Sequence, residues 1–227
     1  MGTDAQDRPG VAERGESEFD RGLSFYDAIY GFAATLLVAN VDAPAPEAWQ
    51  SLRTLFTDDV VDQLLGFVIS FVVIVVFWRV NVTLVRRLSG LDGPTTAVNL
   101  AAAGLVILLP FTTEGISDAA TTDLPLPTAI YAVNVAAVAL AQVAMFQVAR
   151  SRGLERNPIP SRLNRIQLLD ALVVPLYFLA SVPVALVVSA DAARLSWLGL
   201  IVVAPVSGRL VRVASRRQPA ASAPSAS

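Results

Sequence analysis

One carboxylate lies inside a segment that otherwise has the composition of a membrane span. Asp27 is one turn inside the run from Arg21 to Val41, which reads RGLSFYDAIYGFAATLLVANV. A carboxylate at the centre of a span costs about 2.5 kcal/mol or more, and intramembrane acids usually pair or line pathways. Near the start of a helix, a carboxylate can instead accept hydrogen bonds from free N–H groups and stabilise the first turn. Asp27 is therefore either a structural acid or part of a polar pathway.

The surroundings of Asp27 form two contrasting helix faces. At about 100° per residue, one stripe holds the small and polar residues Ser24, Asp27, Ala28, Gly31, Thr35 and Ala39. Its edge holds Phe25, Phe32 and Leu36, and the far side holds Tyr26, Tyr30, Ala33 and Leu37. A small, polar face suits a helix–helix seam or a water-filled path better than it suits lipid. Both interpretations stay open on this pattern alone.

A carboxylate at this depth needs partners, and the sequence offers a few. Asn81 and Asn99 lie near the same end of their own apolar segments, and Arg21 precedes Asp27 by six residues. Because an asparagine amide can donate to a carboxylate, we expect a cluster of these four residues. Gln142, in a later segment, is expected to make an isolated interhelical hydrogen bond.

Composition places the whole chain in the membrane. Of the 227 residues, 54% are hydrophobic and 16% are charged, against about 25% charged in soluble domains. The apolar residues fall into six blocks, near 23–41, 63–85, 97–113, 126–149, 167–189 and 193–213. Their lengths fit helices that span a bilayer, and the alternation of a β-barrel is missing. We predict an all-α membrane protein with six transmembrane helices.

The distribution of arginine predicts the orientation. All 17 basic residues are arginine, and only Arg53 and Arg194 fall in the first, third and fifth connections. The other arginines lie in the termini and in the second and fourth connections, which predicts that both termini are cytoplasmic. We also expect the protein to be in the plasma membrane. Residues 1–20 are expected to be a disordered acidic arm and residues 214–227 a disordered tail, with the helical domain at 21–213.

Several function classes are excluded by what the sequence lacks. It contains no cysteine and no histidine, and it has no G-x-S-x-G motif. Thiol, triad and Cys/His metal chemistry are therefore excluded, and we predict no enzyme, no metal site and no cofactor. Nothing predicts a nucleic-acid partner or a small-molecule substrate. A TVGYG-type loop is also missing, so no re-entrant pore loop is expected.

Three motifs together resemble the transmembrane protein 175 family of lysosomal and bacterial potassium channels. The first apolar segment resembles the family's Arg-x-x-x-Phe-Ser-Asp signature, followed by Thr-Leu-Leu; it matches at Arg21, Phe25, Asp27, Thr35, Leu36 and Leu37. Tyr26 replaces the family's serine. In VFWRVNVTLV, Trp78 matches and Asn81 replaces a histidine. The run VNLAAAGLVILLPFTTE is similar to the family's third-helix pattern.

The resemblance implies a potassium-preferring cation channel. Such bacterial channels are homotetramers of six-helix chains, and their first helices line the pore. Carried onto this chain, the constriction falls at Phe32, with Leu36 and Ala39 beyond it, and the threonine ring at Thr35. The resemblance also implies a network of polar residues and their neighbours that holds the pore helix: Arg21, Phe25, Asp27, Asn81 and Asn99. Potassium would be the permeant ion, and the partners would be further copies of the chain and the lipid bilayer.

The alternative function is a proton- or cation-coupled secondary transporter that uses Asp27. Transporters of that kind place the site near the bilayer midplane, between two repeats with broken helices. Asp27 lies away from the midplane, and the sequence shows no convincing internal repeat. The pattern therefore favours the channel.

Overall fold

In the computed structural model, residues 10–13, 17–56, 58–118 and 120–200 are described. Six long helices carry the fold: α1 (Ser17–Leu36), α3 (Asp58–Arg86), α4 (Gly93–Ile107), α5 (Leu109–Ser117), α6 (Pro125–Ser151) and α7 (Ser161–Val187). The shorter elements are η1 (Leu37–Asn40), η2 (Pro46–Gln50), α2 (Leu52–Leu55), α8 (Ala190–Trp197), β1 (Val11–Glu13) and β2 (Gly90–Asp92).

The described residues form an all-α membrane protein, as predicted. They contain five helical segments that are long and apolar enough to cross a bilayer: Phe19–Asn40, Gln63–Arg86, Gly93–Ser117, Pro125–Ser151 and Ser161–Val187. The predicted sixth span, 193–213, begins in α8, but residues 201–213 lie outside the described part of the chain. The predicted tail, 214–227, lies outside it as well. Six spans and the membrane orientation therefore stay predictions.

The third span is broken into two helices. It was predicted as one run, 97–113, but α4 ends at Ile107 and α5 begins at Leu109. Pro110 has no N–H to donate to the preceding turn, which explains the interruption. The hydroxyls of Thr112 and Thr113 donate to the carbonyl of Leu109 at 3.1 and 2.7 Å. Polar groups at the break are thus hydrogen-bonded inside the bundle.

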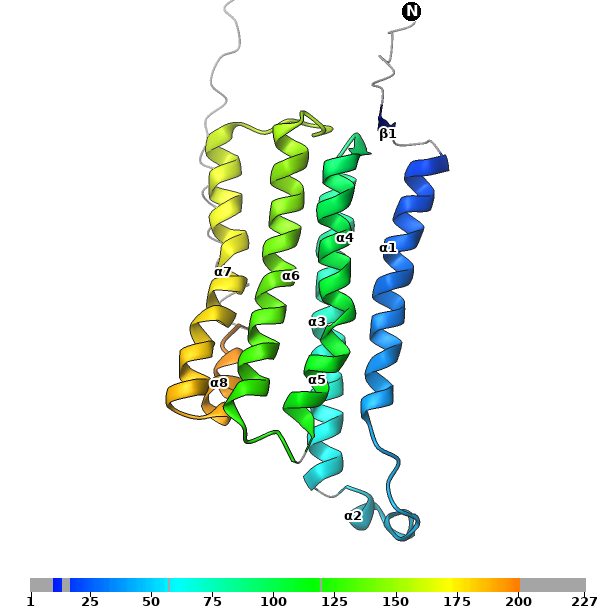
Figure 1. Cartoon of the computed structure of the whole chain (residues 1–227), viewed down its shortest axis with the longest axis vertical. Helices are drawn as coiled ribbons and strands as arrows, with labels where there is room; N and C mark the ends of the chain where they lie inside the picture. Colours follow the sequence, from blue (N-terminus) through cyan, green and yellow to red (C-terminus); the bar gives the residue numbers. More distant parts are fainter. Residues whose placement is uncertain (1–9, 14–16, 57, 119, 201–227) are drawn as a thin grey trace, which may run out of the picture.

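Helix α6 lies at the centre of the bundle and α1 lies at its edge (Figure 1). Most of the apolar window of α6, 61%, is buried, whereas only 22% of the window of α1 is buried. Tyr131, Val135 and Val138 of α6 pack in one core with residues of α1, α3 and α5. Helix α1 packs on α3, α4 and α5 with one side, so the other side is left without neighbours among the described helices of the single chain.

A two-stranded ribbon ties the start of α1 to the end of α3. Strand β1 pairs antiparallel with β2, with Val11 opposite Asp92. The disorder predicted for residues 1–20 is therefore wrong for Val11–Glu13, and α1 already begins at Ser17. Strand β1 has only three residues, and its backbone groups form hydrogen bonds with β2. So short a strand gives no pattern that can be detected from composition.

Asp92 secures this ribbon to α4 and α6. Its carboxylate accepts a hydrogen bond from the Thr95 N–H at 3.0 Å, which caps α4, and it pairs with Arg152. Burial alone would raise the pKa of Asp92, but the hydrogen bonds from Thr95 and Arg152 outweigh it and lower that pKa. The stabilisation is present at neutral pH and is lost only as the pH falls through the lowered pKa.

Candidate functional site

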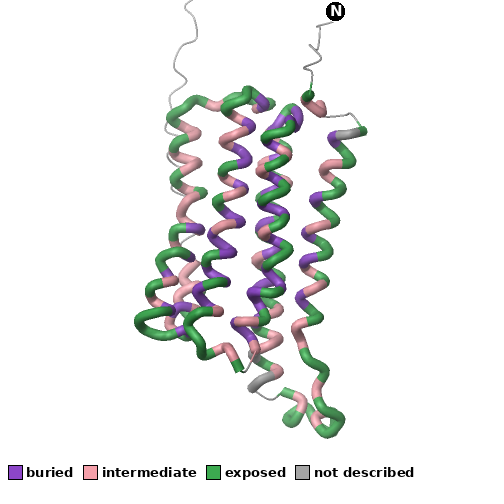
Figure 2. Tube along the Cα trace, viewed as in Figure 1, coloured by how far each residue is buried: buried purple, intermediate pink, exposed green. Residues whose placement is uncertain are grey.

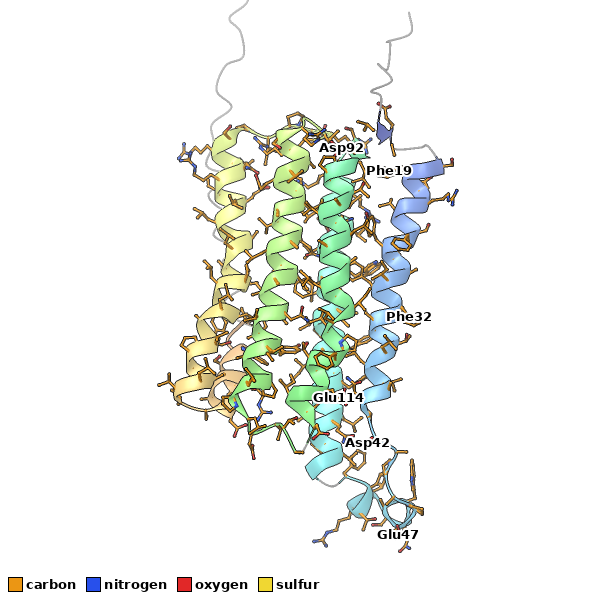
Figure 3. All side chains as sticks on the ribbon, in the orientation of Figure 1. Phe19, Phe32, Asp42, Glu47, Asp92 and Glu114 are labelled. Carbon is orange, nitrogen blue, oxygen red and sulfur yellow. The ribbon has the colours of Figure 1, made fainter. Side chains whose placement is uncertain are left out.

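The unpartnered face of α1 carries the small and polar residues. Exposed residues of α1 include Asp27, Gly31, Phe32 and Thr35, and the Phe32 side chain is 64% exposed. On the opposite face, the buried residues are Tyr26, Tyr30, Ala33 and Leu37. Figure 2 shows this alternation along α1, and Figure 3 labels Phe32 in the half of the helix that leads to its end at Leu36. Phe25 and Val38 are exposed as well. We call the exposed small and polar residues, together with Phe32, the α1 stripe: Ser24, Asp27, Ala28, Gly31, Phe32, Thr35 and Ala39.

The stripe ends on a tightened turn. The α-helix stops at Leu36, which is half-buried, and η1 continues to Asn40 as a 3₁₀ turn, a common way for a helix to end. Ala39 therefore sits on η1 and not on a regular α-helix as expected, although it is exposed. The Asn40 Nδ2 donates to the carbonyl of Pro110 at 2.5 Å. This bond fixes the end of the α1 stripe to the break between α4 and α5.

Asp27 has a different partner from the expected one. The Trp78 Nε1 of α3 donates to the Asp27 Oδ1 at 2.8 Å. Arg21 is exposed and forms no ion pair with Asp27 within the described residues. The indole is planar and reaches the carboxylate from the neighbouring helix, so the intramembrane carboxylate is held by a neutral donor. The sequence contained a signal for this contact, because Trp78 matches the pattern of the family that the chain resembles. Trp78 and Asp27 are 51 positions apart, however, so the sequence alone did not show that they pair.

The two asparagines form a separate buried pair. The Asn81 Nδ2 donates to the Asn99 Oδ1 at 2.6 Å, and both residues are buried between α3 and α4. Tyr26 is buried nearby and its hydroxyl donates to the Thr96 carbonyl at 3.4 Å. The expected single cluster of four residues is therefore wrong, because these asparagines and Asp27 have separate partners. Phe25, the remaining residue of the predicted network, is exposed and its ring packs edge-on against Tyr26.

Gln142 is a further contact of α1 that was predicted only as an isolated bond. Its Nε2 donates to the Tyr30 hydroxyl and to the Phe77 carbonyl, each at 2.9 Å. One buried amide of α6 thus binds α1 and α3 together. The pattern that indicates such a role is a lone glutamine among the small residues of AVALAQVAM.

Acidic residues gather at the opposite end of the chain from Asp92. Figure 3 shows Glu114 at the level of the last turn of α1 and Asp42 and Glu47 below it. Asp42 is held in place by Gln63, whose Nε2 donates to its Oδ2 at 3.3 Å. Within the described residues, no group of three or more His, Cys, Asp or Glu side chains is placed to hold a metal ion.

Comparison with known proteins finds one family model that is similar to the first part of the chain. Residues 21–110 match the model of the endosomal/lysosomal potassium channel TMEM175 family. No curated protein matches the chain. The fold is similar to that of a TMEM175 homolog from Chamaesiphon minutus, whose crystal structure is described as that of a lysosomal potassium-selective channel. The TM-score is 0.68 at 20% identity, covering 85% of this chain and 99% of the other.

The match includes the elements that build the α1 stripe. Residues 21–110 span α1, α3, α4 and the start of α5, and with them Asp27, Trp78, Asn81 and Asn99. The shared fold extends the likeness over most of the remaining helices. The likeness to the TMEM175 family therefore lies in the sequence over residues 21–110 and in the fold over most of the chain.

Proposed function

We propose that the protein is a potassium-preferring cation channel, formed by four copies of the chain around a pore lined by α1. The family and the similar fold support this function, because both carry the description of a potassium channel. The channel domain is residues 21–213, the membrane is the plasma membrane, and both termini are cytoplasmic. Potassium is the permeant ion, and the chain needs no cofactor.

The observation that carries the proposal is the chemistry of the unpartnered α1 stripe. Gly31 and Thr35 are exposed in the single chain, and a carboxylate, Asp27, is exposed on the same face. A lipid-facing helix presents large apolar side chains, since a polar group in hydrocarbon is costly. Water along a symmetry axis accommodates this face, and further copies of α1 shield its apolar edge.

The narrowest part of the proposed pore lies at Phe32. Its ring is exposed and neighbours Gly31 and Thr35 on the stripe. Four aromatic rings around one axis would form an apolar constriction that excludes water when narrow. Thr35 follows one turn later, and its hydroxyl donates to the Phe32 carbonyl at 2.8 Å, which leaves the oxygen free to accept or to face an ion. Leu36 and Ala39 continue the constriction.

Contacts from the neighbouring helices, to both the exposed and the buried side of α1, hold the pore helix. Trp78 binds Asp27 from α3, and Gln142 binds Tyr30 from α6. The paired amides of Asn81 and Asn99 fix α3 against α4 beneath Tyr26. We assign these groups to positioning, together with Arg21 and Phe25 at the first turns of α1.

The test is potassium flux in liposomes after shortening Phe32. In Phe32→Ala, the smaller side chain widens the constriction and lets water enter it. Potassium flux therefore rises several-fold over that of the native channel. The matched control is Phe71→Ala, because Phe71 of α3 is also exposed, at 41%, but lies off the stripe. Unchanged flux in Phe32→Ala, with a conducting native protein, would contradict the proposal. Flux that saturates and follows a pH gradient would identify the coupled transporter instead.

A further inference from the structure

The exposed face of α3 changes character near one end of the helix. Leu65, Val68, Val72 and Val76 are exposed along this face. Their spacing of three and four residues keeps them in one stripe of an α-helix. The same spacing continues through Arg79, Thr83 and Arg86, which are exposed too. We call Arg79, Thr83 and Arg86 the arginine face; it is the polar end of an otherwise apolar, membrane-length stripe.

The two guanidinium groups of the arginine face lie on one side of the helix. Seven residues advance an α-helix by about 10 Å and return it to within about 20° of the same direction. Thr83 lies between them, and its hydroxyl donates to the Arg79 carbonyl at 2.7 Å. The face is opposite the buried residues Asn81 and Val85, which point into the bundle. The arginines therefore point away from the chain's own helices.

These arginines also differ from others at the same end. Arg150 pairs with Glu155 at 2.6 Å, and Arg152 pairs with Asp92. Arg87, next to Arg86, lies over the Phe146 ring and donates to Gln167 at 3.0 Å. Within the described part of the chain, neither Arg79 nor Arg86 forms an ion pair. Two cations at the end of an apolar face thus have no anionic partner among the residues that the structure describes.

We propose that the arginine face binds the phosphate of an anionic phospholipid, whose acyl chains lie along the apolar part of the same stripe. Guanidinium groups bind phosphate oxygens through paired N–H donors, and arginine stems extend along apolar surface toward the headgroups. Phosphate groups of anionic lipids lie at the boundary where such a stripe turns from apolar to cationic. Trp78, next to Arg79, donates to Asp27, so the bound lipid touches the segment that holds α1.

The test measures bound lipid by native mass spectrometry of the full chain in detergent. Phosphatidylglycerol and phosphatidylcholine are titrated separately, because they share acyl chains and differ in headgroup charge. The native protein is expected to bind phosphatidylglycerol more tightly. In the double variant Arg79→Gln/Arg86→Gln, that binding weakens by about fivefold for each arginine removed, while phosphatidylcholine binding stays unchanged.

Two controls separate specific binding from general charge and from misfolding. Arg156→Gln removes an exposed arginine at the same end of the chain, in the loop after α6, and should keep the preference. Unchanged phosphatidylcholine binding shows that the double variant is folded, and the single variant Arg79→Gln provides a milder test. The proposal is overturned if the native protein has no preference, or if the double variant keeps it. It is also overturned if the double variant keeps its lipid binding but no longer forms oligomers. That result would show that the arginines contact another copy of the chain.

Discussion

Two helices of this bundle, α1 and α3, each expose a face along their whole length, and the two faces have opposite chemistry. The α1 stripe holds glycine, alanine, threonine and a carboxylate, with Phe32 as its large exposed ring. The exposed face of α3 holds leucine and valine and ends in arginine. A helix face that is exposed in the single chain can therefore meet either of two environments in the membrane. We infer that the α1 stripe meets water and its own copies, and that the α3 face meets lipid.

The difference also shows where each helix satisfies its polar groups. Asp27 is on the exposed side of α1, yet its hydrogen bond comes from Trp78 of α3. Before the arginine face, α3 keeps Ser70 inside the bundle, where it bonds Tyr131 and Thr113, and the buried Asn81 bonds Asn99. A helix that faces lipid must turn its polar groups inward, whereas a helix beside water can leave them outside.

The largest predicted effect comes from one carboxylate placed on each face at matched depth. Gly31 lies nine residues before the end of its span, and Val72 lies nine residues after the start of its span. Val72→Asp exposes a charge to hydrocarbon, and we expect a loss of about 3 kcal/mol in stability. Gly31→Asp places the charge toward water and costs much less. Thermal unfolding of both variants in lipid nanodiscs measures the contrast, and equal losses would break the comparison.

A second pair of variants compares glycines on the two helices. A Cβ at Gly66 of α3 would lie 2.6 Å from the Ser117 Cβ of α5, so Gly66→Ala must push these helices apart. We expect a loss of about 2 kcal/mol, the cost of overpacking. A Cβ at Gly31 meets no atom within 4 Å, so Gly31→Ala should leave stability unchanged or raise it by up to about 1 kcal/mol. Chemical denaturation of both variants under the same conditions compares their losses of stability. A larger loss in Gly31→Ala than in Gly66→Ala would contradict the prediction.

The smallest predicted effect concerns the bond that joins the two helices. Trp78→Phe keeps a ring on α3 and removes the Nε1 donor to Asp27, and we expect a loss of about 1 kcal/mol. Asp27→Asn keeps an acceptor of similar size and lacks the charge. A double-mutant cycle of the two substitutions isolates the pairwise energy. Strictly additive losses would show that the indole does not hold the carboxylate.

The faces of α1 could be predicted because helical periodicity is local. Once residues 23–41 are placed on a helix, the positions of Tyr30 and Thr35 on opposite sides follow from spacing alone. The division between small and large side chains then indicates which face leaves the bundle. The all-α membrane class was predictable for a similar reason, since span length and apolar composition are properties of each segment alone.

The partners of polar residues could not be predicted from the same pattern. Trp78 and Asp27 are 51 positions apart, and Gln142 and Tyr30 are 112 positions apart. Depth in the membrane suggested Asn81 and Asn99 as partners for Asp27, but several donors lie at that depth and only packing selects among them. Strand β1 escaped prediction because three residues with intermediate burial carry no periodic signal. The break after α4 had a signal in Pro110, which the sequence interpretation treated as part of one span.

The most direct test of the central claim, that the α1 stripe meets water, uses the absence of native cysteine. Thr35 lies five residues before the end of its span, and Val68 lies five residues after the start of its span. Single variants Thr35→Cys and Val68→Cys are reconstituted in liposomes and treated with a charged, membrane-impermeant methanethiosulfonate. We predict rapid modification at position 35, with loss of potassium flux, and no modification at position 68. Protection of position 35 together with modification of position 68 would contradict the account.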